Sequence, residues 1–402
     1  MGDERSLRTP LLRAVAAAFV AVMLWQTWGG IRKGIWVDTD VYRMGGQLIR
    51  EGGDLYSAAS NVNLPFTYSP FAGAVFVPFS FVDVNAGRYL FTALSLACFG
   101  LMVFVVARRL RLTAWQTTAV VAVGLAMEPM LRDLLLGQIN LVLMALVVVD
   151  WLVVPPRYRG FLTGIAAGIK ITPGAFVLLA VLRRDWATVA RAAVGFLTTG
   201  LIGWVVAPTA SATYWGGAFL GLDRFGNVAL IGSDNQSLVA CWMRLTRSLE
   251  APTWVTLVCF VVGLGLGLTA AWLEIRARRP GYEVASMAWL ALGALLASPV
   301  SWTHHWLWMI VVIAVLLARG KVVRASVATV LVWFPTVWLL DPLEYAKLQY
   351  SAAMAVASCV YAALAITLLL LAVHDLAGRE GGSEGSAEEG ESAVVPEAAA
   401  RG

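Results

Sequence analysis

The chain has 402 residues, of which 59% are hydrophobic and only 14% are charged, and its mean hydropathy is +0.74. Soluble globular proteins carry about 25% charged residues, so this composition excludes an ordinary soluble domain and indicates a polytopic membrane protein. The formal net charge of +5 comes from basic residues scattered between apolar runs, which argues against nucleic-acid binding. The four cysteines show no CxxC spacing and are interpreted as small core residues.

The first apolar run covers residues 10–31, close to the ~20 residues that cross a bilayer. Arg5, Arg8 and Arg13 flank it, which predicts a retained span with the N-terminus in the cytoplasm. A polar loop over residues 32–69 then follows on the outer side.

A short surface helix is predicted inside this loop, from about 39 to 50. Asp38 stands at the N-cap position, apolar residues then recur at helical spacing, and Gly52-Gly53 supplies the stop. Asp40 falls in the first turn, where the helix dipole favours a carboxylate, and Tyr42 lies one turn after Asp38. The two carboxylates can therefore be local helix signals, or catalytic groups beside aromatic side chains.

Further apolar runs follow as far as residue 373. They lie at about 70–82, 86–107, 113–130, 139–154, 160–182, 186–207, 252–275, 282–300, 304–319, 322–340 and 349–373. The turns between these runs are basic, which favours the cytoplasm. All of them can be cytoplasmic only if the runs at 70–82 and 160–182 do not each cross the membrane once as a single helix. Both runs contain helix breakers, which predicts a re-entrant segment at 70–82 and a broken helical pair at 160–182.

These observations predict an all-α membrane helical bundle with about 10–13 membrane segments, ten of them full crossings. Residues 1–373 would form one transmembrane catalytic domain, with the first outside loop at 32–69. Residues 374–402 are rich in Gly, Ser, Glu and Ala, which predicts an acidic, disordered cytoplasmic tail.

The outside loops of this topology are 32–69, about 128–138, 208–236, around 300–305, and 341–348. The polar motifs fall there: Gly137-Gln-Ile-Asn140, Asp234-Asn-Gln-Ser237 and Ser298-Pro-Val-Ser-Trp-Thr-His-His305. One face of the membrane therefore holds nearly every uncommitted polar group, and a functional site is expected on that face.

Several basic groups are candidates for binding an anion. Lys170 lies between the two halves of an apolar run, where it either snorkels to the cytoplasm or anchors a phosphate or carboxylate. His304 and His305 lack a third ligand at zinc spacing, so each is a candidate donor to a phosphate or sugar hydroxyl, or a structural hydrogen-bonding group. Arg132 either pairs with the adjacent Asp133 or belongs to the site.

Uncharged polar and aromatic residues in these loops are candidates for binding sugar hydroxyls or stacking on a sugar ring. They are Tyr42, Tyr68, Gln138, Asn140, Asn235, Gln236 and Trp302. For the amides, helix capping is an equally good explanation, and most of the 17 Trp residues fit interfacial belts.

Seven motifs occur in an order that resembles one enzyme family. They are Asp38-Thr-Asp-Val-Tyr42, Asp54-Leu-Tyr56, Phe66-Thr-Tyr-Ser-Pro-Phe71, Gly137-Gln-Ile-Asn140, Lys170-Ile-Thr-Pro173, Asn235-Gln-Ser237 and Ser298–His305. Together they resemble the GT-C glycosyltransferases of family 87, the polyprenyl-phosphate-mannose-dependent α-mannosyltransferases of actinobacterial envelopes. The resemblance covers about residues 10–373 and leaves out the acidic tail.

This resemblance implies a catalytic Asp in the first outside loop, and the family's Asp-x-x-x-Tyr spacing falls on Asp38 and Tyr42. Asp40 is an additional carboxylate and stays open as the base. The family's paired histidines fall on His304 and His305. The expected reaction moves mannose, with inversion, from a polyprenyl-phosphate donor in the bilayer to a glycolipid acceptor of the phosphatidylinositol mannoside or lipomannan type. The product linkage would be α, most simply α-1,2, and no cofactor or metal is expected.

Two other functions fit parts of the sequence. Envelope enzymes that use polyprenyl-phosphate arabinose have a similar layout. A polyprenyl-lipid transporter or flippase would share broken helices and intramembrane charge, but the sequence shows no internal repeat, and its polar groups gather on one face instead of at the midplane. A purely structural scaffold would not need Asp38, Asp40, Lys170 and two histidines.

Overall fold

The structure, a computed structural model, describes residues 34–57, 64–217, 230–333 and 348–391, with side chains as far as 377, and the isolated positions Ala21, Trp25 and Gly29. The predicted first span at 10–31 and parts of the loops at 208–236 and 341–348 lie outside the described residues.

Regular secondary structure in the described residues is helical, apart from isolated bridge positions such as the pair Asn235 and Trp302, so the predicted all-α class is confirmed. Among the residues that the structure describes, four helical stretches are long and apolar enough to cross a membrane: α4 (Val84–Leu110), α10 (Trp186–Val206), α14 (Thr253–Ala277) and Val360–Ala377 of α20 (Val360–Glu391). A fifth candidate is the pair α6 (Glu128–Leu136) and α7 (Asn140–Leu152), which is bent by 115°. The chain is a multi-pass membrane protein.

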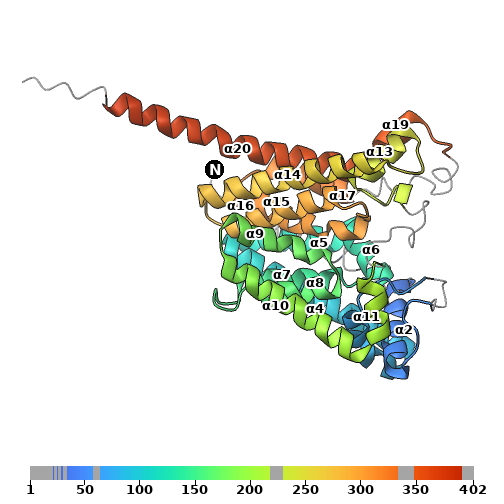
Figure 1. The fold of residues 1–402 in the computed structure, drawn as a ribbon. Coiled ribbons are helices and arrows are strands. Elements are labelled where there is room, and N and C mark those ends of the chain that lie inside the picture. Colours follow the sequence, from blue (N-terminus) through green and yellow to red (C-terminus); the bar gives the residue numbers. More distant parts are fainter. Residues whose placement is uncertain are drawn as a thin grey trace, which may run out of the picture.

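Shorter helices pack among these spans (Figure 1). They are α2 (Val37–Glu51), α3 (Pro70–Phe76), η1 (Val77–Phe81), α5 (Ala114–Ala126), α8 (Phe161–Ile169), η2 (Thr172–Phe176), α9 (Val177–Leu182), α11 (Pro208–Trp215), α13 (Leu238–Thr246), α15 (Tyr282–Ala297), η5 (Thr303–Trp308), α16 (Met309–Ala318), α17 (Val322–Trp333) and α19 (Ala352–Ala357).

The predicted break in the run at 160–182 is present. Helix α8 ends at Lys170, whose backbone is extended at φ −142° and ψ 127°, and the chain resumes as η2 with Pro173 in its first turn. The run at 70–82 is also irregular, because α3 changes to a 3-10 helix where Pro78 cannot donate a backbone hydrogen bond.

Two expectations about the remaining segments differ from the structure. The stretch at 128–138 is mostly helix α6 instead of a loop. The run at 349–373 is two helices, α19 and α20, and the Ser358 carbonyl at their junction accepts hydrogen bonds from Gln236 and Arg244. Helix α20 is described as far as Glu391, and the disordered tail over 374–402 stays a prediction.

The two ends of the bundle differ in character. At one end lie α2, α6, α11, α13 and α19 (Figure 1). At the other end the basic turns meet: Arg109 donates to the Leu152 carbonyl, and Arg279 donates to the Asp375 carbonyl at 3.0 Å. The predicted polar motifs gather at the first end.

Helices α14 and α15 approach each other through small residues. Gly263 and Gly267 of α14 form a GxxxG pattern that faces Gly293 and Ala297 of α15. A Cβ on Gly267 would lie 2.7 Å from the Gly293 Cα atom, which is backbone and cannot rotate away. Close backbone packing of this kind is a main source of helix association in membranes.

Replacing Gly267 by Ala is therefore expected to destabilise the protein by about 1–3 kcal/mol, as overpacking of a tight contact usually does. The measurement is the apparent melting temperature of the purified protein in detergent. Gly265→Ala is the matched control, since a Cβ there has no atom within 4 Å. An equal change in both variants would contradict the close-packing explanation.

Candidate active site

Helix α2 begins where it docks on the C-terminal end of α6. The backbone N–H groups of Ile35 and Trp36 both donate to the Leu135 carbonyl, at 3.1 and 3.0 Å. The Thr39 hydroxyl donates to the Gly137 carbonyl at 3.0 Å. Gly137 has a positive φ of 69°, and a Cβ there would lie 1.9 Å from the Thr39 hydroxyl, so this junction requires glycine.

Asp38 lies within the first turn of α2, so the prediction that Asp38 is the N-cap is wrong. The residue before the helix is Trp36, in the left-handed conformation with φ 40°, and its side chain makes no capping hydrogen bond. The Asp38 carboxyl is not used as a cap and instead faces the Gln138 side chain in the site.

Partial burial governs the charge state of Asp38. Loss of hydration raises the pKa of this carboxyl to about 6, and a hydrogen bond from the Gln138 side chain and the positive charges of Lys170 and Arg132 act in the opposite direction. Asp38 is therefore ionised at neutral pH and is a stronger base than a fully hydrated aspartate.

Two tyrosines hold the Gln138 amide in place. The hydroxyls of Tyr42 and Tyr68 lie 3.0 and 3.2 Å from the Gln138 Oε1 atom, and 3.0 Å from each other. The Ile139 backbone N–H donates to the Tyr42 hydroxyl at 3.3 Å. With Oε1 accepting from the tyrosines, the Gln138 NH₂ group is directed to Asp38.

Asp40 is committed elsewhere. Its two carboxylate oxygens accept from Arg88 of α4, at 3.0 Å from Nε and 2.5 Å from Nη2. The Arg88 guanidinium also lies 5.5 Å from the centroid of the Trp36 ring. This partner, 48 residues away, could not be predicted from the sequence pattern.

Lys170 lies in the site and does not snorkel to the other end of the bundle. Its ammonium donates to the Asn140 Oδ1 atom at 3.0 Å and lies 3.2 Å from the His305 Nε2 atom. An ammonium can only donate, so His305 Nε2 is the acceptor, and the other ring nitrogen donates to the Val300 carbonyl. Two of the three ammonium protons are used in this way, and the third can meet a bound anion.

Asn140 connects this group to two others. Its NH₂ group donates to the Asp133 Oδ1 atom at 2.9 Å and to the His304 carbonyl at 3.2 Å. Within the described part of the chain, the Asp133 Oδ2 atom and both ring nitrogens of His304 have no hydrogen-bond partner, although both residues are buried. Trp302 lies beside the histidines, with its ring centroid 5.8 Å from each. Asp133 had been considered only as a partner of Arg132.

The suggested pair of Arg132 with Asp133 does not form. Arg132 instead lies 3.9 Å from the Asp234 carboxylate, while Asp133 faces Asn140. Neighbouring residues of a helix point about 100° apart, so an adjacent pair on α6 is badly placed to share one ion pair. Arg132 remains close enough to Asp38 and His304 to affect their charge states.

Asn235 and Gln236, for which the sequence left capping and sugar binding open, are fully buried and bind backbone groups. Asn235 donates to the carbonyls of Leu230 and Pro299 and accepts from the N–H groups of Ser237 and Ser301. Gln236 donates to the Ser233 and Ser358 carbonyls and accepts from the Tyr361 N–H group. These two amides fasten the loop before α13 to its neighbours.

An apolar cleft of about 390 Å³ leads away from Lys170. Asn140 and His305, the two partners of Lys170, lie in its wall together with residues of α7, η2, α14 and α15. Phe260 and Ile171 also line it and are about half exposed, at 48% and 50%. The cleft is therefore an apolar space, open at the bundle surface, that reaches the two partners of Lys170.

Among the residues that the structure describes, no three His, Cys, Asp or Glu side chains are grouped as metal ligands. The site instead combines a carboxylate of raised pKa, a lysine and a histidine pair at the end of an apolar cleft. This arrangement suits proton abstraction beside a bound lipid-linked anion.

Comparison with known proteins agrees with this chemistry. The sequence model of glycosyltransferase family 87 matches residues 66–299. A polyprenol-phosphate-mannose-dependent α-(1-2)-phosphatidylinositol mannoside mannosyltransferase of Mycolicibacterium smegmatis is 33% identical over 356 residues, which cover 79% of each chain. The protein of the same description from Mycobacterium tuberculosis is 33% identical over 333 residues, 76% of this chain and 74% of its own.

The chain belongs to glycosyltransferase family 87 and is a glycosyltransferase. Among solved structures, the crystal structure of ArnT from Cupriavidus metallidurans in the apo state aligns with 96% of this chain and 82% of its own. Its TM-score is 0.43 and its sequence identity is 14%, which is too distant to support a functional comparison.

The assignment of Asn235 to the loop instead of to a substrate can be tested. Asn235→Ala would leave the Leu230 carbonyl and the N–H groups of Ser237 and Ser301 without this partner, and each unsatisfied group typically costs about 1–3 kcal/mol. We expect a clearly lower melting temperature, whereas Asn85→Ala, at an exposed position, should leave it nearly unchanged. A normal melting temperature together with a raised KM for a sugar substrate would instead assign Asn235 to substrate binding.

Proposed function

We propose that this enzyme transfers mannose from a polyprenyl-phosphate-mannose donor to a glycolipid acceptor of the phosphatidylinositol mannoside or lipomannan type. The transfer would invert the anomeric centre and form an α-linkage, α-1,2 by analogy with the relatives. The observation that carries the proposal is the coincidence of this family membership with a partly buried carboxylate and a lysine at the end of an apolar cleft.

The cleft suits the donor. A polyprenyl chain is apolar and matches a wall formed by side chains such as Leu143, Phe176 and Trp308. Its phosphate would then lie beside His305 and the remaining proton of the Lys170 ammonium. Since the leaving phosphate gains negative charge in the transition state, a cation already held in position stabilises that state more than the ground state. Arg132 and His304 lie close by as further donors to the phosphate or the sugar.

We assign Asp38, and not Asp40, as the base. Asp40 is neutralised by a two-point contact with Arg88 at the outer side of α2, whereas Asp38 faces Gln138 and the cations of the site. In the reaction, the acceptor hydroxyl oxygen attacks the anomeric carbon and its proton passes to the Asp38 carboxylate. The bond from the anomeric carbon to the phosphate oxygen breaks, and polyprenyl phosphate leaves.

Tyr42, Tyr68 and Gln138 act as positioning residues, because their network ends on Asp38. Trp302, beside both histidines, is placed to stack on the transferred sugar. The reaction would take place on the outer face of the membrane, with both termini in the cytoplasm. The gathering of basic turns at the opposite end of the bundle supports this orientation, since such turns favour the cytoplasm.

The first test compares Asp38→Asn and Asp40→Asn with wild type in transfer from labelled polyprenyl-phosphate mannose to an extracted mannolipid acceptor. Loss of a general base typically lowers the rate 10²–10⁴-fold. We expect a loss of this size in Asp38→Asn and less than about tenfold in Asp40→Asn. Parallel assays with a chelator should show the same rates, because the proposed mechanism uses no metal.

The outcomes separate the alternatives. A large loss of transfer activity in Asp40→Asn alone would identify Asp40 as the base and leave the assignment as a mannosyltransferase unchanged. Absence of transfer by wild type from the mannose donor, with transfer from polyprenyl-phosphate arabinose, would reject mannose as the sugar. Absence of transfer from both, with movement of the intact lipid across vesicles, would reject the transferase in favour of a flippase.

The second test uses pH. Since Asp38 must be ionised to accept a proton, kcat/KM should fall as the pH drops through about 6 in wild type. In Gln138→Leu the hydrogen bond to the ionised form is lost, which raises the pKa further and moves this acidic limb to higher pH. Asp40→Asn is the control and should keep the wild-type limb. A limb that does not move in Gln138→Leu would assign it to another group.

A further inference from the structure

A second cavity, of about 370 Å³, lies at the opposite end of the helices from Asp38. It is bounded by the turn between α14 and α15, the end of α16, the start of α17 and the side of α20. The helical segment Thr303–Ala318 runs from the histidine pair to this cavity, a length of roughly 25 Å. The cavity is therefore separate from the proposed active site.

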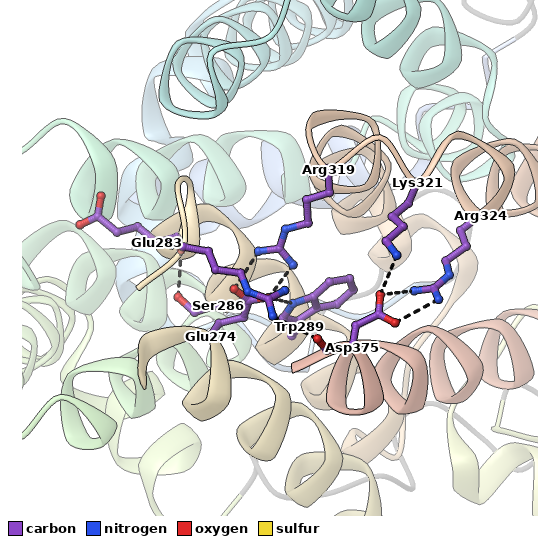
Figure 2. Close-up of polar contacts among 9 residues, drawn as sticks. Glu274, Glu283, Ser286, Trp289, Arg319, Lys321, Arg324 and Asp375 are labelled. Atoms are coloured by element: carbon purple, nitrogen blue, oxygen red, sulfur yellow. Dashed lines mark hydrogen bonds and ion pairs between the residues drawn. The ribbon is translucent and has the colours of Figure 1, made fainter. Parts of the chain in front are cut away.

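Four basic side chains line this cavity: Arg279, Arg319, Lys321 and Arg324. Figure 2 shows Arg319, Lys321 and Arg324 pointing from one side towards Glu274 and Asp375 on the other. Arg319 makes two contacts with the buried Glu274, at 2.5 and 2.7 Å. Arg324 makes two contacts with Asp375, at 2.6 and 3.2 Å.

The two carboxylates do not balance the four cations. Lys321 shares the Asp375 carboxylate with Arg324, at 3.3 Å. Arg279 donates to the backbone carbonyl of Asp375, and within the described residues it has no carboxylate partner. The cavity thus carries an excess of about two positive charges, which is enough to bind a phosphate group.

The wall behind the cations is apolar. Trp289 of α15, Leu316 of α16 and Leu368 of α20 form much of it. A volume of this size lies within the range of ligand cavities, about 300–1,000 Å³. Cations at the rim and aliphatic side chains behind them match a ligand with a phosphate head and an apolar portion.

We propose that this cavity binds a phosphate ester, with the Arg279 guanidinium and the Lys321 ammonium as its principal donors. Arg319 and Arg324 already form ion pairs with Glu274 and Asp375, which fix the orientation of their guanidinium groups. Their remaining N–H groups can face the anion. The matching source is the headgroup of an anionic phospholipid, since basic cavities between transmembrane helices bind such headgroups. A soluble phosphate ester shares the same chemistry.

The test measures the melting temperature of the full-length protein in detergent while short-chain phosphatidylglycerol, phosphatidylcholine or glycerol 3-phosphate is titrated. We expect saturable stabilisation by phosphatidylglycerol that phosphatidylcholine does not reproduce. Loss of a hydrogen bond to a charged group should weaken the apparent Kd of Arg279→Gln by at least about tenfold. Arg276→Gln is the matched control, because Arg276 lies in the same turn, stacks on Trp272 and does not line the cavity.

Stabilisation by phosphatidylglycerol alone supports a lipid site, and stabilisation by glycerol 3-phosphate as well supports a site for soluble phosphate esters. Lys321→Gln, at a half-exposed position, supplies a second variant if Arg279→Gln does not fold. The proposal would be overturned if phosphatidylglycerol stabilised the cavity variant, Arg279→Gln or Lys321→Gln, as strongly as it stabilises wild type and Arg276→Gln. Equal stabilisation by phosphatidylcholine would overturn it as well, and the cluster would then be an internal charge network.

Discussion

The 115° bend between α6 and α7 is the constraint on which the site depends. A helix that stops inside the bundle leaves carbonyl groups without intrahelical partners, and here the carbonyls of Leu135 and Gly137 receive the start of α2. The same bend places Gln138 and Asn140 side by side. One meets Asp38, and the other meets Lys170 at the break after α8. Two interrupted helices thus bring a carboxylate and a cation together in an otherwise apolar bundle.

Two carboxylates only two residues apart have opposite environments because α2 is a helix. Two positions along a helix correspond to a rotation of about 200°, so Asp38 and Asp40 point to nearly opposite sides. Asp40 meets a guanidinium and becomes part of the contact between α2 and α4, whereas Asp38 loses water without gaining a direct ionic partner. Partial burial together with the cations of Lys170 and Arg132 leaves Asp38 with a pKa of about 6, so it is ionised at neutral pH and can still accept a proton.

Much of this organisation could be predicted from the sequence. The hydrophobic runs predicted most of the helices, and the helix-breaking residues around Lys170 and Pro173 predicted the interruption after α8. The polar motifs gather at one end of the bundle, as expected. The partners of buried polar groups could not be predicted, because they are set by which backbone groups remain unpaired after packing. For Asn235 and Gln236, sugar binding and capping therefore stayed equally good explanations, and the contact of Asp40 with Arg88, 48 residues away, was missed. The helix start at Trp36 was missed for the same reason, since contacts with carbonyls of α6 position this start and no capping side chain marks it.

The apolar cleft beside Asn140 and His305 has a consequence for how the enzyme meets its donor. Phe260, on the candidate span α14, and Ile171 are half exposed at its rim, so under the proposed function the donor enters from the two-dimensional lipid phase and not from the surrounding water. The effective donor concentration is then its mole fraction among the surrounding lipids. Diluting the donor with inert lipid at constant bulk concentration would slow the enzyme, whereas diluting the whole suspension with buffer would not.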